Sequence, residues 1–128
     1  MPTKPWIAYW PTNVPLTLEY PKIPLYQLVK DAAEAFPNNT AYIFQDESIS
    51  YDQFYTQIKK FATVFHTLGV KYADRVALYL PNLPAYLISF FAVNMIGAIA
   101  IPCNVAYREK EIKFLLKDSE AETIVVLD

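Results

Sequence analysis

The 128-residue sequence predicts an α/β fold in which a partial, mostly parallel sheet is flanked by helices. From residue 40 onward, strand-like and helix-like segments alternate in the order strand, helix, strand, helix, strand, helix, strand. The later strand-like segments, at residues 74–81, 98–102 and 123–128, have largely continuous apolar runs. This pattern is typical of parallel strands that are covered on both faces. A proline-rich segment precedes these elements. We therefore expect an arm at residues 1–24 and an α/β subdomain at residues 25–128.

The arm is predicted from its proline and aromatic content. Six of the ten prolines lie in it, at Pro2, Pro5, Pro11, Pro15, Pro21 and Pro24, and the aromatic residues between them are Trp6, Tyr9, Trp10 and Tyr20. Proline fixes φ and removes a backbone donor, so the segment is expected to be extended and polyproline-II-like. Two interpretations are open: the arm lies across its own domain, or it reaches a neighbouring subunit.

A first helix and a hairpin are expected next. Five apolar residues recur at helical spacing before Pro37, which ends the pattern; they are Leu25, Leu28, Val29, Ala32 and Phe36. This spacing predicts an amphipathic helix. Residues 40–46 and 47–51 are strand-like, and we expect them to pair through a tight turn at Asp46 and Glu47.

The helix from Ser50 to about Leu68 has the clearest boundaries. Ser50 and Gln53 have the spacing of a capping box, and Gly69 supplies a left-handed residue that stops the helix. The apolar residues at the 3.6-residue period are Phe54, Ile58, Phe61, Phe65 and Leu68. His66 lies away from this stripe, so we expect it to be partly exposed and non-catalytic.

After a buried strand at residues 74–81 comes an uncharged stretch, PNLPAYLISFFAVNMIGAIAIP, at residues 81–102. Its length approaches that of a membrane span. However, Asn94 lies inside it and no Lys or Arg flanks it to set an orientation. We expect instead a helix, with Asn82 available as its cap and Pro84 at an early position, and then Gly97 and a strand at residues 98–102.

The uncharged helix is apolar on every side. Leu87, Ile88, Phe91 and Met95 lie on one face; Phe90, Val93 and Ile96 lie on the other. A helix that is apolar all round must be covered all round, and only the first face has an obvious partner in the sheet. We therefore expect the second face to form an exposed apolar patch, and the subdomain to be an incomplete part of a larger protein.

The chain closes with a helix at residues 107–122 and a strand at residues 123–128. Ile112, Leu115 and Leu116 are expected to point inward, and Glu109 and Lys113 have the spacing of an ion pair.

Composition excludes several functions. A net charge of −2 with scattered Lys and Arg gives no reason to expect nucleic acid. The single cysteine, Cys103, cannot form an internal disulfide, and a cytoplasmic protein is expected. With one histidine and one cysteine, no multi-ligand zinc site is expected. The two glycines, Gly69 and Gly97, are too far apart for a phosphate-binding loop.

Asn82 and Asn104 follow the ends of two predicted parallel strands, where ligands gather in open α/β sheets. Helix capping and turn formation explain both residues without a ligand. No catalytic, cofactor-binding or metal-binding residue is assigned within the chain.

Residues 49–54, ISYDQF, and 94–104, NMIGAIAIPCN, resemble the first two core motifs of the adenylate-forming superfamily, which includes the acyl-CoA synthetases. The resemblance covers essentially the whole chain. The arm is most similar to long- and medium-chain fatty acyl-CoA synthetases. Phe54, Ile96 and Cys103 depart from the usual motif residues, which are changes in packing only.

The resemblance implies the N-terminal part of a ligase that joins a fatty acid to ATP, with Mg²⁺, and then transfers the acyl group to CoA. The family's phosphate loop, acidic motif and lid domain belong to later sequence, so these 128 residues are expected to be inactive alone. Two alternatives stay open: a stand-alone paralogue that acts as an interaction module, and a membrane-anchored protein. Self-association through the arm or the apolar face, and contact with a membrane surface, are compatible with the sequence.

Overall fold

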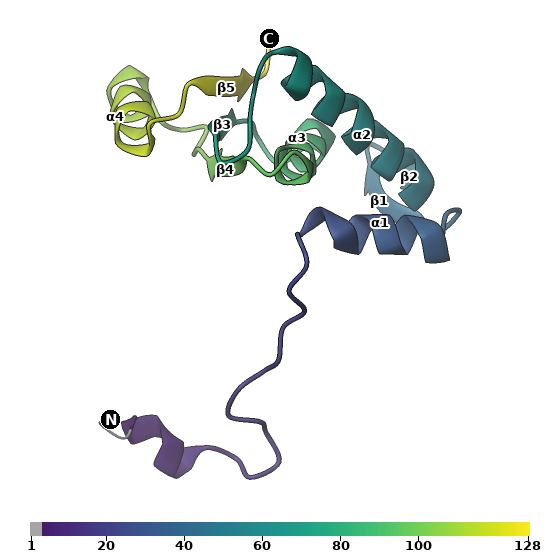
Figure 1. Ribbon diagram of the computed structural model, residues 1–128, viewed down its shortest axis with the longest axis vertical. Helices are drawn as coiled ribbons and strands as arrows, with labels where there is room; N and C mark the ends of the chain where they lie inside the picture. Colours follow the sequence, from purple (N-terminus) through teal and green to yellow (C-terminus); the bar gives the residue numbers. More distant parts are fainter. Residues whose placement is uncertain (1–3) are drawn as a thin grey trace.

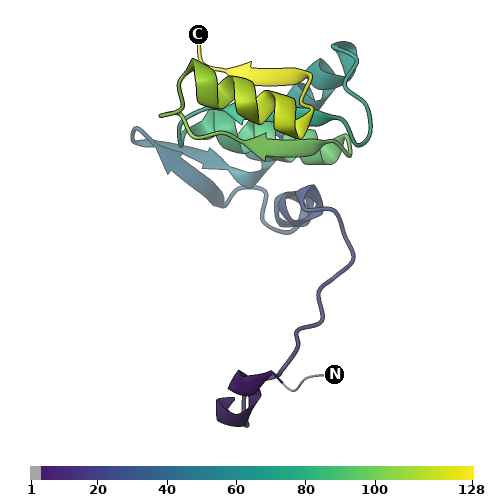
Figure 2. The ribbon, with the colours of Figure 1, turned by 90° about the vertical axis from the view of Figure 1, so that its left-hand side faces the viewer.

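The computed structural model describes residues 4–128. The elements follow in the order η1 (Pro5–Tyr9), α1 (Tyr26–Ala35), β1 (Thr40–Phe44), β2 (Glu47–Ser50), α2 (Tyr51–Thr67), β3 (Arg75–Tyr79), α3 (Pro84–Met95), β4 (Ile99–Pro102), α4 (Glu109–Ser119) and β5 (Thr123–Val126). The parallel sheet lies between α4 on one face and the α2–α3 pair on the other (Figures 1 and 2). The predicted α/β class is therefore confirmed.

The parallel sheet has the strand order β4-β3-β5. In its register, Val76 of β3 lies opposite Ala100 of β4 and Thr123 of β5. Because β3 is central and covered on both faces, Val76, Ala77 and Leu78 are fully buried. This strand is the centre of the hydrophobic core.

The first two strands form a separate antiparallel sheet. Phe44 pairs with Glu47, so the connecting turn consists of Gln45 and Asp46. Both have positive φ, 48° and 66°, which is the type I′ geometry that suits a two-residue hairpin. The turn therefore begins one residue before the predicted pair, Asp46 and Glu47. The reason is that a type I′ turn needs two consecutive residues with positive φ, and these are Gln45 and Asp46.

The predicted capping box at the start of α2 is confirmed. The Gln53 backbone N–H donates to Ser50 Oγ at 3.3 Å, and the Ser50 backbone N–H donates to Gln53 Oε1 at 2.9 Å. Gly69, with φ of 87°, follows the helix as expected. Leu68, predicted to be inward, is exposed, because it lies at the C-cap beyond the last packed turn.

In α1 the predicted apolar stripe is only partly correct. The buried residues are Val29 and Ala33, which are four residues apart and face α2. Leu28 and Phe36 lie to the sides of this narrow contact and are exposed. Leu25 precedes the helix and is exposed as well.

The uncharged stretch divides into helix, glycine and strand as predicted, but its second face is not exposed. Val93 is 0% exposed, and Phe90 and Ile96 are partly buried against the core. Helix α2 packs along α3, and its Phe54 ring meets the ring of Phe91, on the first face of α3, edge-on at 5.8 Å between centroids. The predicted apolar patch on Phe90, Val93 and Ile96 is therefore wrong.

Exposed apolar side chains of the subdomain are spread over several elements, including the outer strands of the parallel sheet and α4. Those on the outer strands and α4 include Ile99, Phe114, Ile124 and Val126. The inward direction of Ile112, Leu115 and Leu116 is confirmed, since they are the apolar side chains of α4 that are partly buried. The predicted Glu109–Lys113 ion pair is not formed, and among residues 4–128 the ion pairs are Lys30–Glu34 and Arg75–Glu120. Within the described residues, no helix is both long enough and apolar enough to cross a bilayer.

The arm differs from the expected extended chain. Residues 5–9 form the short 3₁₀-helix η1, which Pro5 begins, and only the residues after it are irregular. Every residue from 4 to 24 is exposed, and both views show this segment projecting away from the subdomain (Figures 1 and 2). The arm therefore does not lie across its own domain. Residues 1–3, including Pro2, lie outside the described part of the chain.

Candidate functional site

The candidate site lies at the carboxyl ends of the central parallel strands. Strand β3 ends at Tyr79 and β4 ends at Pro102, and their parallel register brings both ends to the same edge of the sheet. Ligands of open α/β sheets bind at this edge, where loops leave the strands. Here the relevant loops are residues 80–83 and 103–108.

The Tyr79 hydroxyl holds the second of these loops. Its oxygen lies 2.7 Å from the Tyr107 carbonyl oxygen and 2.9 Å from the Val105 carbonyl oxygen. A phenol has one proton to donate, so the two carbonyls share it. A side chain of β3 thus fixes the backbone that follows β4. No local sequence pattern indicates this contact, because it joins residues more than 25 positions apart.

Asn104 shapes the same loop. Its Oδ1 accepts a hydrogen bond from the Ala106 backbone N–H at 2.9 Å, and its carbonyl oxygen accepts one from the Tyr107 N–H at 3.0 Å. This side-chain-to-backbone pattern is an Asx turn. The predicted turn-forming role of Asn104 is confirmed.

Asn82 does not have the predicted role of a helix cap. The N-cap of α3 is Leu83, and no side chain caps that helix, so the expected capping by Asn82 is wrong. Pro84 does stand in the first turn, where its missing N–H has no intrahelical partner to lose. Asn82 is exposed and lines a hollow between β1 and α3.

Cys103 lies directly after β4 and is buried. Its Sγ lies 3.3 Å from the Ile101 carbonyl oxygen, to which the thiol donates. Burial raises the pKa of the Cys103 thiol, so the neutral form is favoured. A thiol in this state packs as a small apolar group and is a poor nucleophile.

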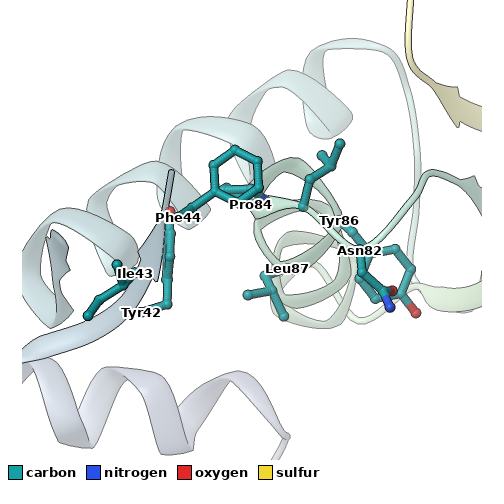
Figure 3. A pocket seen from close by; sticks show the side chains of 8 residues that line it. Tyr42, Ile43, Phe44, Asn82, Pro84, Tyr86 and Leu87 are labelled. Carbon is teal, nitrogen blue, oxygen red and sulfur yellow. The ribbon is translucent and has the colours of Figure 1, made fainter. Parts of the chain in front are cut away.

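The hollow beside this edge has a volume of about 280 Å³. Its lining comes from β1 on one side and from the start of α3 on the other (Figure 3). The lining residues are Tyr42, Ile43, Phe44, Asn82, Leu83, Pro84, Tyr86 and Leu87. The Tyr42 hydroxyl donates to Gln57 Oε1 at 3.3 Å. Burial raises the pKa of the Tyr42 hydroxyl. The hollow is thus mostly apolar with few polar groups, which suits an apolar ligand group.

The residues of this edge do not form a nucleophile–base pair. The single histidine, His66, is exposed on α2, as predicted. The two glycines, Gly69 and Gly97, both have positive φ and end α2 and α3, ahead of the amino ends of β3 and β4. They are helix-terminating residues at the opposite edge of the sheet. Among residues 4–128, no three His, Cys, Asp or Glu side chains gather where they could hold a metal ion.

Comparison with known proteins gives the family. Residues 29–128 match the family model described as AMP-binding enzyme. The chain therefore belongs to the AMP-binding enzyme family, and the resemblance seen in its motifs is confirmed.

The individual relatives are acyl-CoA ligases. The chain is 34% identical over 125 residues to the long-chain-fatty-acid–CoA ligase of Bacillus subtilis (strain 168), covering 98% of this chain and 22% of that protein. It is 34% identical over 106 residues to the crotonobetaine/carnitine–CoA ligase of Salmonella paratyphi A (strain ATCC 9150 / SARB42), covering 79% of this chain and 20% of that protein. The chain thus spans about a fifth of the length of these curated relatives.

A solved structure agrees with the fold. The N-terminal domain of FACL13 from Mycobacterium tuberculosis superposes with a TM-score of 0.76 at 28% identity, covering 80% of this chain and 26% of that chain. The α/β body described above is thus similar to part of the N-terminal domain of FACL13.

Proposed function

We propose that this chain forms part of the N-terminal domain of a ligase that activates a fatty acid with ATP and transfers the acyl group to CoA. The observation that carries the proposal is the match of 98% of the chain to a long-chain-fatty-acid–CoA ligase. The apolar hollow at the carboxyl edge of the sheet is compatible with such a substrate class.

The chain's own contribution is proposed to be structural. In this role the β4-β3-β5 sheet and the α2–α3 pair form a rigid wall, and Tyr79 and Asn104 fix the loop at its ligand edge. Rigid elements of this kind hold ligand-contacting groups in place, including groups supplied by other parts of an enzyme.

The residues from 4 to 128 do not fit a nucleotide–magnesium site. Phosphate oxygens need several backbone N–H groups close together, and Mg²⁺ needs carboxylate oxygens and water. The two glycines stand at the other edge of the sheet, and acidic side chains do not cluster at the carboxyl edge. We therefore propose that these residues alone neither bind ATP tightly nor form an acyl-adenylate.

A chimeric enzyme tests the proposal. The 128 residues replace the matching region of the Bacillus subtilis ligase, and acyl-CoA formation from a long-chain fatty acid is measured. We expect a folded chimera to be active, and the 128-residue chain alone to give no ATP–pyrophosphate exchange above background. A chimera carrying Leu78→Asp, which places a charge in the fully buried centre of the sheet, is the control for loss of folding.

A chimera that unfolds cooperatively but makes no acyl-CoA would contradict the proposal. If the chimera does not fold, the 128-residue chain is co-expressed with the Bacillus subtilis ligase from which the matching region has been removed. Failure of the two parts to copurify and restore activity would then also contradict it. ATP–pyrophosphate exchange by the 128-residue chain alone would refute the proposal that the chain's own contribution is structural.

A further inference from the structure

We draw no further inference here: the strongest candidate, the apolar hollow between β1 and the start of α3, belongs to the site already described, and in a chain that spans about a fifth of the length of its curated relatives nothing in the structure shows what covers it.

Discussion

The Tyr79 hydroxyl oxygen and the Tyr107 carbonyl oxygen lie 2.7 Å apart, which ties the end of β3 to the loop that follows β4. The neighbouring Val105 carbonyl shares the same donor at 2.9 Å. Parallel strands are joined by long crossover connections, and here a side chain of one strand bonds to the loop that follows its neighbour. At the candidate site, one phenol supplies that contact.

Replacing Tyr79 with Phe should loosen this loop while the sheet stays intact. The change removes one donor, and a hydrogen bond of this type contributes about 1 kcal/mol to the free energy of unfolding. We expect faster amide hydrogen exchange at residues 105–107 and a small loss of stability. Tyr72→Phe, at an exposed tyrosine, is the matched control. If exchange rises throughout β3 instead, Tyr79 supports the core and not the loop.

The Ser50–Gln53 capping box gives a second prediction. Ser50→Ala removes the oxygen that accepts from the Gln53 backbone N–H, and should lower the free energy of unfolding by about 1 kcal/mol. Ser48→Ala serves as the control, because Ser48 is exposed in β2 two residues earlier. Urea denaturation of the two variants measures the difference. Equal stabilities would show that α2 is held by its packing alone.

Local signals predicted much of this fold. The capping box, the glycine after α2 and the alternation of elements each act within a few residues, so the sequence contains all that is needed to detect them. The same is true of Asn104, whose side chain bonds to a backbone group two residues away. These elements and this turn are where prediction and structure agree.

The features that could not be predicted depend on contacts between residues that are far apart in the sequence. Periodicity left the second face of α3 without a partner, whereas Val93 on that face is 0% exposed in the folded chain. It also did not indicate that α2 contacts the first face, where the Phe54 ring meets the Phe91 ring. The hollow is another example, because β1 and α3 are far apart in sequence and meet only in the folded chain. The Tyr79 contact with the loop after β4 has the same origin. Periodicity shows that a face is apolar, but it does not identify the partner.

Cys103 should make stability depend on alkaline pH. Burial raises the pKa of the native thiol above its ordinary value of 9.0, so the unfolded chain loses its proton first as the pH rises. The contribution of the protonated Cys103 thiol to the free energy of unfolding is fully present below that ordinary value. It is lost as the pH rises through the raised pKa of the native thiol. The free energy of unfolding should therefore fall with alkaline pH more steeply than in Cys103→Ala, as measured by urea denaturation.

Thiol reactivity checks the same environment of Cys103. Iodoacetamide should alkylate the native protein much more slowly than the urea-unfolded chain at the same pH, because the thiol is buried and neutral. Equal rates in the two states, or identical alkaline profiles for the variant and the parent, would show that this side chain is accessible in the native protein.

Val93 provides the most direct test of how α3 is covered. The side chain is 0% exposed, so Val93→Ala should leave a small cavity and lower the free energy of unfolding by about 2 kcal/mol. Val64→Ala is the matched control: it makes the same change within a helix, at a side chain that is 47% exposed. Both variants gain similar helix propensity, so the difference between them isolates burial. Nearly equal midpoints in urea would mean that this face of α3 is open to solvent, as the sequence alone suggested.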